Sequence, residues 1–442
     1  MRNYKNQNFN KASNIKTDLG KKIFFVLFIL IIYRVGTYIS LPGVNLSILD
    51  NFIKDQGRGM MGMFNTFTGG ALGRMSIFTL NIMPYITSSI IMQLLTVLSK
   101  ELKELKKSSE TGRQKINQYS KYLSVVLALF QGYGIAVGIE SFTYANINLV
   151  SNPGVYFRVI SMFSLMGGTM VVIWLADQIN TKGIGNGSSI IIFTGIVSGF
   201  IPSLISLLEM GKNKAVSLPF LCLFFVALII MLILVVFMET SQRKLLVQYP
   251  MKQIGKKIYS GDSTHLPIKI NISGVIPPIF ANALLLLPST IIGFSVDSRT
   301  NSWRYFIENY LSQSKPLYII LYSIFIIFFC FFYSIIVFNP HETAENLRKN
   351  GAVIIGRRPG TQTKKYLQYI INRITVIGSS YITVLCIIPE ILINQFNMLF
   401  YLSGTSILIV VSVVLDLSIQ IQSYLLSNKY ANLMQKTSII RT

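Results

Sequence analysis

Few residues of this 442-residue chain could do chemistry, and they are scattered along it. Four carboxylates, Asp177, Glu239, Glu390 and Asp416, lie near the ends of long apolar segments, and Arg34 lies within another such segment. Ionisable side chains in the middle of a membrane commonly mark proton or ion pathways. Near a segment end, exposure at the membrane interface is the simpler interpretation. The pattern therefore disfavours ion-coupled transport of a small solute.

Histidine, cysteine and glycine patterns indicate neither a catalytic site nor a metal site. The 2 histidines lie in polar connections, and the 3 cysteines lie in apolar segments without the spacing of metal ligands. The glycine-rich run 183–187 (GIGNG) lacks the lysine and the preceding strand of a phosphate-binding loop. We expect it to be a tight turn with glycines at positive φ. We therefore predict that the chain is not an enzyme and that it uses no cofactor.

The elements that must position these residues are apolar helices. The chain is 51% hydrophobic and only 13% charged, against about 25% charged residues in soluble domains. Segments of about 18 or more apolar residues are long enough to cross ~30 Å of hydrocarbon as helices. Ten such segments predict an all-α polytopic membrane protein. They are 23–41, 76–98, 120–140, 155–176, 184–208, 216–238, 272–293, 316–338, 371–393 and 398–418.

Basic residues gather in alternate connections between these segments. The tail 1–22 and the long connections 240–270 and 339–370 are strongly basic, whereas 141–154 contains no lysine or arginine. By the positive-inside rule we expect both termini and both long connections on the cytoplasmic side of the membrane. The net charge of +23 then follows from topology. On its own it is poor evidence for nucleic-acid binding.

The hydropathy pattern divides the chain into two halves. Five spans lie in 23–208 and five in 216–426, with a hinge at 209–215 and a cytoplasmic tail at 427–442. Because five is odd, the second half enters the membrane upside down, which is the geometry of inverted repeats around a central path. The segment 60–74 is too short and too polar to span. Irregular backbone is tolerated at membrane depth only where it lines a cavity or is buried, so we expect a re-entrant half-helix beside a central pore.

Five stretches of the sequence, in order, resemble the SecY family, the pore subunits of the general protein-secretion translocase. These stretches are Phe67–Gln93, Trp174–Ile192, Ser263–Phe280, Phe338–Thr363 and Gly404–Asp416. The resemblance implies a pore for unfolded polypeptide in the bacterial cytoplasmic (inner) membrane, able to open sideways toward lipid. It further implies the partners SecE, SecG, the motor ATPase SecA, ribosomes, signal sequences and membrane lipids.

The same resemblance assigns four sets of residues. A constricting pore ring would comprise Ile82, Ile86, Ser188, Ile192, Ile279 and Ile409. A displaceable plug within 60–74 would include Met61, Met63, Phe64, Phe67, Gly69, Gly70 and Leu72. A lateral gate would include Pro84, Gln93, Pro277 and Pro278. Docking of the motor or the ribosome would use Arg358, Arg357, Arg243, Lys244 and Lys252.

The physical chemistry of these sets can be argued from the residue types. A ring of branched aliphatic side chains resists ions by dewetting, yet it deforms around a passing chain. Ser188 stands where the family typically has an aliphatic residue, and it would weaken the seal unless its hydroxyl bonds its own helix. Asn81, where the family usually has glycine, and Pro278 also depart from the family pattern. Because proline removes a backbone donor, we expect one gate helix to be weakened at Pro84 and the other at Pro277 and Pro278.

Three classes of function account for parts of this pattern. A protein-conducting channel accounts for the re-entrant segment, the scarce membrane charges and the basic connections together. A secondary transporter would account for the inverted repeat, but the chain offers no coupling residue. A scaffold or insertase without a through-pore would account for the basic connections but not for the ring and the plug.

Overall fold

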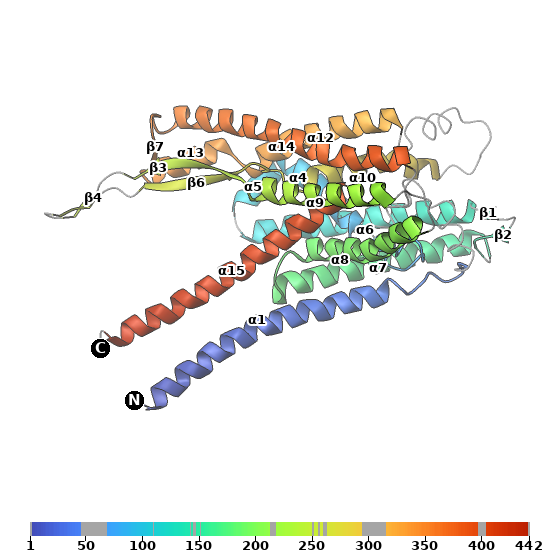
Figure 1. The fold of residues 1–442 in the computed structure, drawn as a ribbon, viewed down its shortest axis with the longest axis horizontal. Helices are drawn as coiled ribbons and strands as arrows, with labels where there is room; N and C mark the ends of the chain where they lie inside the picture. The colour runs from blue at the N-terminus through green and yellow to red at the C-terminus, as the bar shows by residue number, and fades with distance from the viewer. Residues whose placement is uncertain are drawn as a thin grey trace.

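The structure is a computed structural model of the chain. It describes residues 2–45, 69–108, 110–141, 143–144, 147–150, 152–212, 218–249, 252–254, 257–259, 263–293, 315–396 and 404–440. Most of its helices lie along the longest axis of the molecule (Figure 1). Among the described residues, 7 helices are long and apolar enough to cross a membrane, and the shorter apolar helices Met83–Leu98 and Ile276–Leu285 accompany them. The chain is therefore a multi-pass membrane protein.

The first half of the chain contains six described helices and one short strand pair. They are α1 (Arg2–Gly36), α4 (Met83–Leu98), α5 (Lys100–Ser108), α6 (Glu110–Ser141), β1 (Thr143–Tyr144), β2 (Ile147–Asn148), α7 (Val155–Lys182) and α8 (Gly187–Lys212). The expected N-terminal tail is helical and continues into the first apolar segment as part of α1.

The second half contains six helices and five strands in its described residues. They are α9 (Leu218–Thr240), β3 (Gln242–Gln248), β4 (Lys252–Ile254), β5 (Lys257–Tyr259), β6 (Ser263–Lys269), α10 (Ile276–Gly293), α12 (Pro316–Val337), α13 (Pro340–Lys349), β7 (Val353–Ile354), α14 (Thr361–Phe396) and α15 (Gly404–Ile440). α15 extends the last expected span well into the tail.

Two of the expected spans begin later than the sequence predicts. α4 starts at Met83 rather than at 76, because Asn81 has φ of 51° and takes the backbone out of the helical region just before it. α10 starts at Ile276, so Pro277 and Pro278 fall in its first turn, as Pro84 does in α4. The first N–H groups of a helix have no intrahelical acceptor, so proline costs no hydrogen bond there. The expectation that Pro84, Pro277 and Pro278 weaken these two helices by removing backbone donors is therefore wrong.

The segment before α4 is hydrogen-bonded to the residues that follow α1 instead of continuing as helix. Leu41 N–H donates to the Met75 carbonyl at 2.8 Å, and Ile77 N–H donates to the Ile39 carbonyl at 2.9 Å. These bonds satisfy backbone groups that a helix would otherwise satisfy internally. Residues 69–82 therefore have a fixed, non-helical path beside α1.

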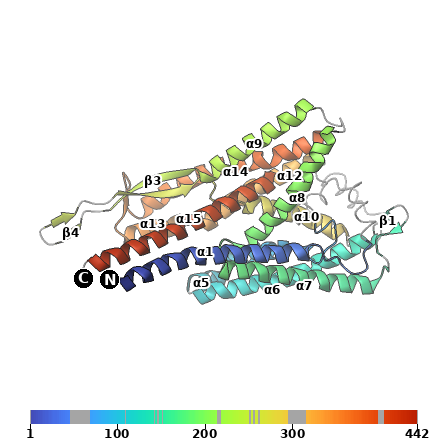
Figure 2. The same cartoon turned by 60° about the horizontal axis from the view of Figure 1, so that its bottom comes forward.

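One end of the molecule carries a small folded layer where hydropathy predicts only long connections. β3 lies between β6 and β7 in a three-stranded antiparallel sheet, and Val247 pairs with both Thr264 and Ile354. Leu245, Val247 and Ile354 pack with residues of α13 and α14 in a separate hydrophobic core. Both chain termini point toward this same end (Figures 1 and 2).

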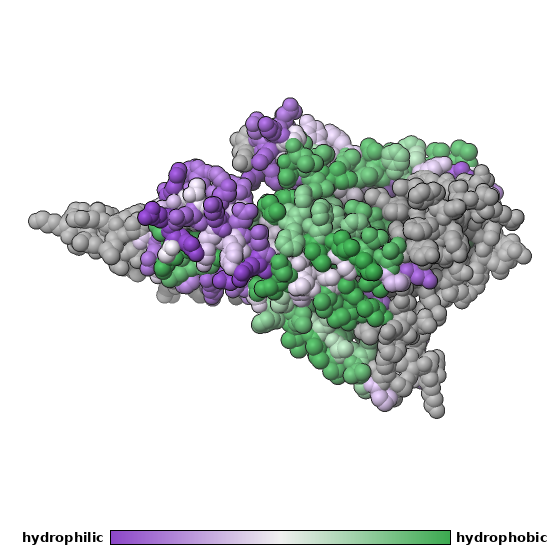
Figure 3. Space-filling model, turned by 90° about the horizontal axis from the view of Figure 1, so that it is seen from above, coloured by the Kyte–Doolittle hydropathy of each residue, from purple (hydrophilic) through white to green (hydrophobic). Residues whose placement is uncertain are grey.

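Surface hydropathy also differs between the middle of the molecule and the end that carries the sheet. Figure 3 shows apolar residues covering the middle of the molecule and polar residues covering the end that carries the sheet. Large exposed hydrophobic side chains include Phe24 of α1 and Phe237 of α9. Such a continuous apolar surface indicates contact with lipid or with other membrane helices.

Candidate functional site

Five of the six residues assigned to the pore ring belong to one hydrophobic cluster. Ile82, Ile192 and Ile409 are buried in it, and the half-buried Ile86 and Ile279 pack against it. The cluster draws on four parts of the fold, because Ile82 and Ile86 flank the start of α4 while the others lie on α8, α10 and α15. Ile82 is only 1% exposed and Ile409 only 3%. The arrangement is a buried hydrophobic contact between elements far apart in sequence, and it also includes aromatic residues such as Tyr33 and Phe78.

Ser188 is held differently from these isoleucines. It lies in the first turn of α8, where its hydroxyl donates to Asn186 Oδ1 at 2.7 Å and its N–H donates to the same oxygen at 3.2 Å. Asn186 thus acts as the N-cap of α8, and Asn180 Oδ1 accepts the Gly187 N–H at 2.7 Å. The Ser188 hydroxyl is satisfied by this cap. The capping role of Asn186 was missed, although an asparagine directly before an apolar run is a recognisable signal.

The glycine-rich run 183–187 forms the turn into α8. Of its glycines, Gly185 has φ of 92°, whereas Gly183 has φ of −96°. The expected positive φ is therefore confirmed at Gly185 and wrong at Gly183.

The backbone at Asn81 explains one departure from the family pattern. Its φ of 51° lies in the left-handed region, and its side chain is 2% exposed. Asparagine enters this region more readily than other non-glycine residues because its short amide can bond locally. Asparagine can therefore adopt the left-handed backbone conformation that glycine would adopt at this position.

The plug assignment falls partly outside the described residues, since Met61, Met63, Phe64 and Phe67 lie there. The described end, which includes Leu72, turns through Gly69 at φ of 66° and Gly70 at φ of 84°.

An arginine of α1 also binds this described end, next to a longer hydrogen bond of 3.5 Å from Ser198 Oγ to the Gly69 carbonyl. Arg34 Nη1 donates to the Gly69 carbonyl at 2.8 Å and to Ser198 Oγ of α8 at 3.1 Å. In the sequence Arg34 is only a charge within a span, and its link to this segment was missed.

The residues assigned to a lateral gate line or flank a small apolar pocket between α4, α10 and α12. Gln93 and Ile90 come from α4, and Pro277 and Phe280 come from α10. Pro84 and Pro278 are buried in the first turns of the two helices. The pocket is walled largely by hydrocarbon and aromatic side chains, so it suits an apolar segment.

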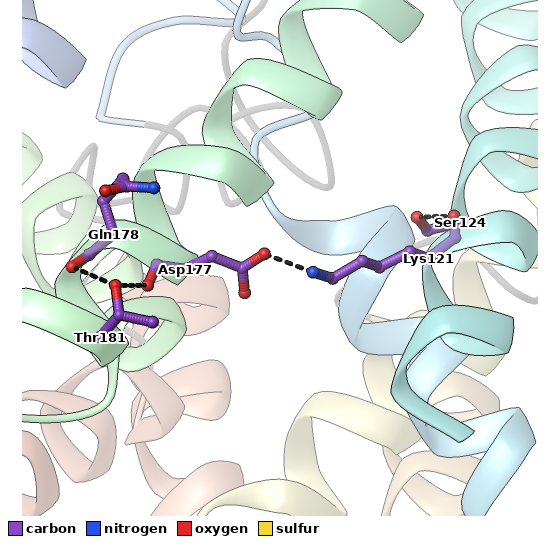
Figure 4. A network of polar contacts seen from close by, with 5 residues as sticks. All are labelled: Lys121, Ser124, Asp177, Gln178 and Thr181. Atoms are coloured by element: carbon purple, nitrogen blue, oxygen red, sulfur yellow. Dashed lines mark hydrogen bonds and ion pairs between the residues drawn. The ribbon is translucent and has the colours of Figure 1, made fainter. Parts of the chain in front are cut away.

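The helices α6 and α7 form a hairpin that is clamped by an ion pair near each end. Lys121 of α6 pairs with Asp177 of α7, and Figure 4 shows the two side chains reaching toward each other. At the other end, Arg158 Nε lies 2.5 Å from Glu140 Oε2. Arg158 was not singled out from the sequence, although a basic residue opening an apolar span is unusual. The two ion pairs hold α6 against α7. Because α4 packs against α6, they also fix the surface on which α4 lies.

A polar joint connects α9 to the start of α10. Asn271 Nδ2 donates to Glu239 Oε1 at 2.6 Å, while Asn271 Oδ1 accepts the Gly274 N–H at 3.0 Å. Glu239 therefore has a structural partner at its span end. Asn271 was missed, because a single asparagine before an apolar run resembles an ordinary connection.

The residues assigned to docking by the family resemblance lie on the folded end of the molecule. Arg243 and Lys244 are exposed on β3, and Arg357 and Arg358 are exposed in the turn between β7 and α14. Lys252 begins β4, and its side chain lies outside the described set. The structure therefore brings both basic connections into one surface, because β3 and β7 are neighbours in the sheet.

Comparisons with known proteins agree with the family resemblance. The sequence model of the SecY family matches residues 76–418. A relative named protein translocase subunit SecY from Rickettsia typhi is 49% identical over 434 residues, covering 98% of this chain and 99% of the relative. The protein of the same name from Escherichia coli K12 is 44% identical over 433 residues, with 98% and 97% covered.

Solved structures share the fold at lower identity. One described as "The structure of a protein conducting channel" has a TM-score of 0.63 and 19% identity, and 92% of each chain is covered. Sec61 in a canine ribosome–channel complex from the endoplasmic reticulum has a TM-score of 0.61 and 19% identity, also with 92% of each chain covered.

Proposed function

This chain belongs to the SecY family, and on that premise we propose that it is the central subunit of a protein-conducting channel. Unfolded polypeptides would cross the membrane through it, and hydrophobic segments would leave it sideways. The observation that carries the proposal is the cluster in which Ile82, Ile192 and Ile409 meet from three separate parts of the chain. Branched aliphatic side chains exclude ions by dewetting and yield to a passing chain, since only dispersion forces join them.

The resting seal would be completed by a plug within 60–74. Its end at Gly69 is held by Arg34, which bridges to Ser198 of α8. A hydrogen bond from a charged donor contributes about 1.5–3 kcal/mol, which is enough to hold a short segment and weak enough to be released. Such marginal local stability is typical of elements that move in function.

Lateral opening would separate α4 from α10. Since the prolines of both helices lie in first turns, the helices can part as rigid bodies without losing internal hydrogen bonds. The apolar pocket between α4, α10 and α12 would receive the hydrophobic core of a signal sequence. Gln93 would supply a polar contact at its wall.

The folded basic end would face the cytoplasm of a bacterium, with both termini on the same side. There the exposed Arg243, Lys244 and Arg358 would dock the motor ATPase SecA or the ribosome. The small subunits SecE and SecG would cover parts of the apolar belt. Both halves of the proposed inverted repeat would then surround one central pore, with lipid outside.

Crosslinking to a polypeptide stalled in transit tests this function. Single cysteines at Ile82 and Ile279, in a background without the native cysteines, should crosslink to the stalled chain in membranes containing SecE and SecA. A cysteine at Ile233 of α9, whose side chain is 64% exposed on the outer surface, is the matched control and should not crosslink. Absence of a crosslink at both cluster positions would contradict the channel path.

A further inference from the structure

Two adjacent arginines in the turn between β7 and α14 have different surroundings. The Arg357 guanidinium carbon lies 4.9 Å from the centroid of the Tyr366 ring, which is a cation–π contact. The Arg358 side chain is exposed, and among the described residues it makes no ion pair or ring contact. Both side chains are exposed, but the Arg357 guanidinium lies against the Tyr366 ring and the Arg358 guanidinium has no such contact.

The backbone of this turn is fixed on both sides of Arg358. Arg357 N–H donates to the Ile354 carbonyl at 3.1 Å. The Thr363 hydroxyl donates to the Arg358 carbonyl at 2.8 Å. Gly356 at φ of 77° and Gly360 at φ of 102° supply conformations that other residues rarely adopt. The turn therefore has one defined path.

The side chains that hold the turn, Thr363 and Tyr366, pack in or against the hydrophobic core of the folded end. Thr363 is 2% exposed and Leu367 is fully buried, one turn further along α14. Tyr366 packs against the same core as β3 and β7. Because Thr363 and Tyr366 are already anchored, they lose little conformational freedom when they hold the turn. The backbone of Arg358 is therefore positioned before any partner binds.

We propose that Arg357, Thr363 and Tyr366 are positioning residues that present Arg358 as the single docking cation of this turn to a carboxylate on the motor ATPase. The inference rests on the proposed docking function. Adjacent guanidinium groups repel each other. Because the Arg357 guanidinium is held on the Tyr366 ring, the Arg358 guanidinium is directed away from that of Arg357. A single free guanidinium fork matches one carboxylate through two parallel hydrogen bonds. Ribosomal RNA, by contrast, is bound through the sum of many phosphate contacts.

A double-mutant cycle on the intact channel complex tests the division of roles. The affinity of SecA for vesicles containing the complex is measured for Arg357→Gln, Arg358→Gln and the double variant. Arg358→Gln should weaken binding about tenfold or more, as loss of a charge-assisted hydrogen bond does. Arg357→Gln should weaken it about threefold when Arg358 is present. In the Arg358→Gln background it should have no further effect, because a positioning residue acts through the group that it positions.

Conservative variants separate positioning from a general loss of structure. Tyr366→Phe keeps the aromatic face and should retain affinity, whereas Tyr366→Leu should lower it as Arg357→Gln does. Thr363→Ser keeps the hydroxyl and should retain affinity, whereas the isosteric Thr363→Val should lower it. The amount of assembled complex in the membrane is measured for all four, and equal losses of complex in both members of a pair would overturn the positioning role.

The outcomes distinguish this inference from the docking function itself. If Arg357→Gln costs the same factor in the Arg358→Gln background as in the unaltered channel, Arg357 contacts the partner directly and the positioning role is wrong. If Arg358→Gln leaves SecA affinity unchanged, the docking assignment of this turn fails, whatever Arg357 does. If Arg358→Gln weakens ribosome binding and not SecA binding, the carboxylate partner is wrong.

Discussion

Arg34 Nη1 donates a hydrogen bond of 2.8 Å to the carbonyl oxygen of Gly69, and this bond ties α1 to the segment that precedes α4. The fit around Gly69 is tight, since a Cβ atom there would come within 2.4 Å of Ser198 Oγ. Three stretches far apart in sequence therefore meet at one carbonyl. The bond gives the described end of the proposed plug a charged anchor on a neighbouring helix.

Replacing Arg34 by Met should raise the resting ion leak of the channel. The variant removes a charge-assisted hydrogen bond of about 1.5–3 kcal/mol, which shifts the plug equilibrium about tenfold or more toward release. Ion conductance of vesicles containing the purified complex measures the leak. Ser198→Ala is the matched control: of the two bonds to the Gly69 carbonyl it removes only the longer one, of 3.5 Å, and keeps the charged donor at 2.8 Å, so it should leak less. A leak in Arg34→Met equal to that of the unaltered channel would show that this bond does not hold the plug.

Ser188→Ala and Ile192→Ser should affect the resting leak differently, although the two positions are one helical turn apart. The Ser188 hydroxyl is bound to Asn186 at 2.7 Å, so its removal should change conductance by less than about twofold. Ile192 belongs to the buried hydrophobic cluster, and a hydroxyl there should help water to enter and raise conductance about tenfold. Conductance of the two variants under the same voltage measures the difference, and equal leaks would contradict it.

The sequence was most informative where residue type and family motif agreed. Ile82, Ile192 and Ile409 share no local signal, because an isoleucine in a membrane helix usually faces lipid or another helix. Only the resemblance singled them out, and the structure brings them into one cluster. Hydropathy located the apolar segments but not the late starts of α4 and α10, which depend on the backbone at Asn81 and on prolines in first turns.

The sheet at the basic end could not be predicted from hydropathy. β3 reads QRKLLVQ, and only Leu245 and Val247 alternate as a half-buried strand should. Its pairing with β7 is between residues about a hundred positions apart in sequence, a relation that no local pattern encodes. The roles of Arg34 and Thr363 depend on backbone carbonyls as partners, and side-chain types alone do not identify such partners.

Asn81→Gly should be tolerated better than Asn81→Val. The left-handed backbone at φ of 51° costs a β-branched residue about 1–2 kcal/mol more than it costs glycine or asparagine. The Val variant should therefore lower the unfolding temperature of the purified complex more than the Gly variant does. Equal unfolding temperatures for the two variants would show that the backbone at this position is not constrained.

Bridging the pocket between α4 and α10 should block secretion. Cysteines at Leu94 and Phe280 lie on opposite walls, and a short bifunctional maleimide would join them and prevent the helices from parting. Cys222 is exposed and must be replaced first, since it would react as well. Secretion should fall only after the reagent is added, and each single-cysteine variant should remain active. Full secretion after bridging would exclude this pocket as the lateral exit.

The ion pair between Lys121 and Asp177 should contribute modestly and measurably to the stability of the α6–α7 hairpin. Both side chains are about a third exposed, at 35% and 36%, so screening by solvent should reduce their coupling to about 0.5–1 kcal/mol. The coupling is obtained from the unfolding free energies of Lys121→Met, Asp177→Asn and the double variant in detergent. Ser124→Ala is the control, because it removes a 2.7 Å bond to the Lys121 carbonyl and leaves the ion pair in place. High salt should reduce the coupling, since the pair is partly exposed. If the two single losses simply add, the pair does not clamp the hairpin, and the packing of α6 against α7 holds it alone.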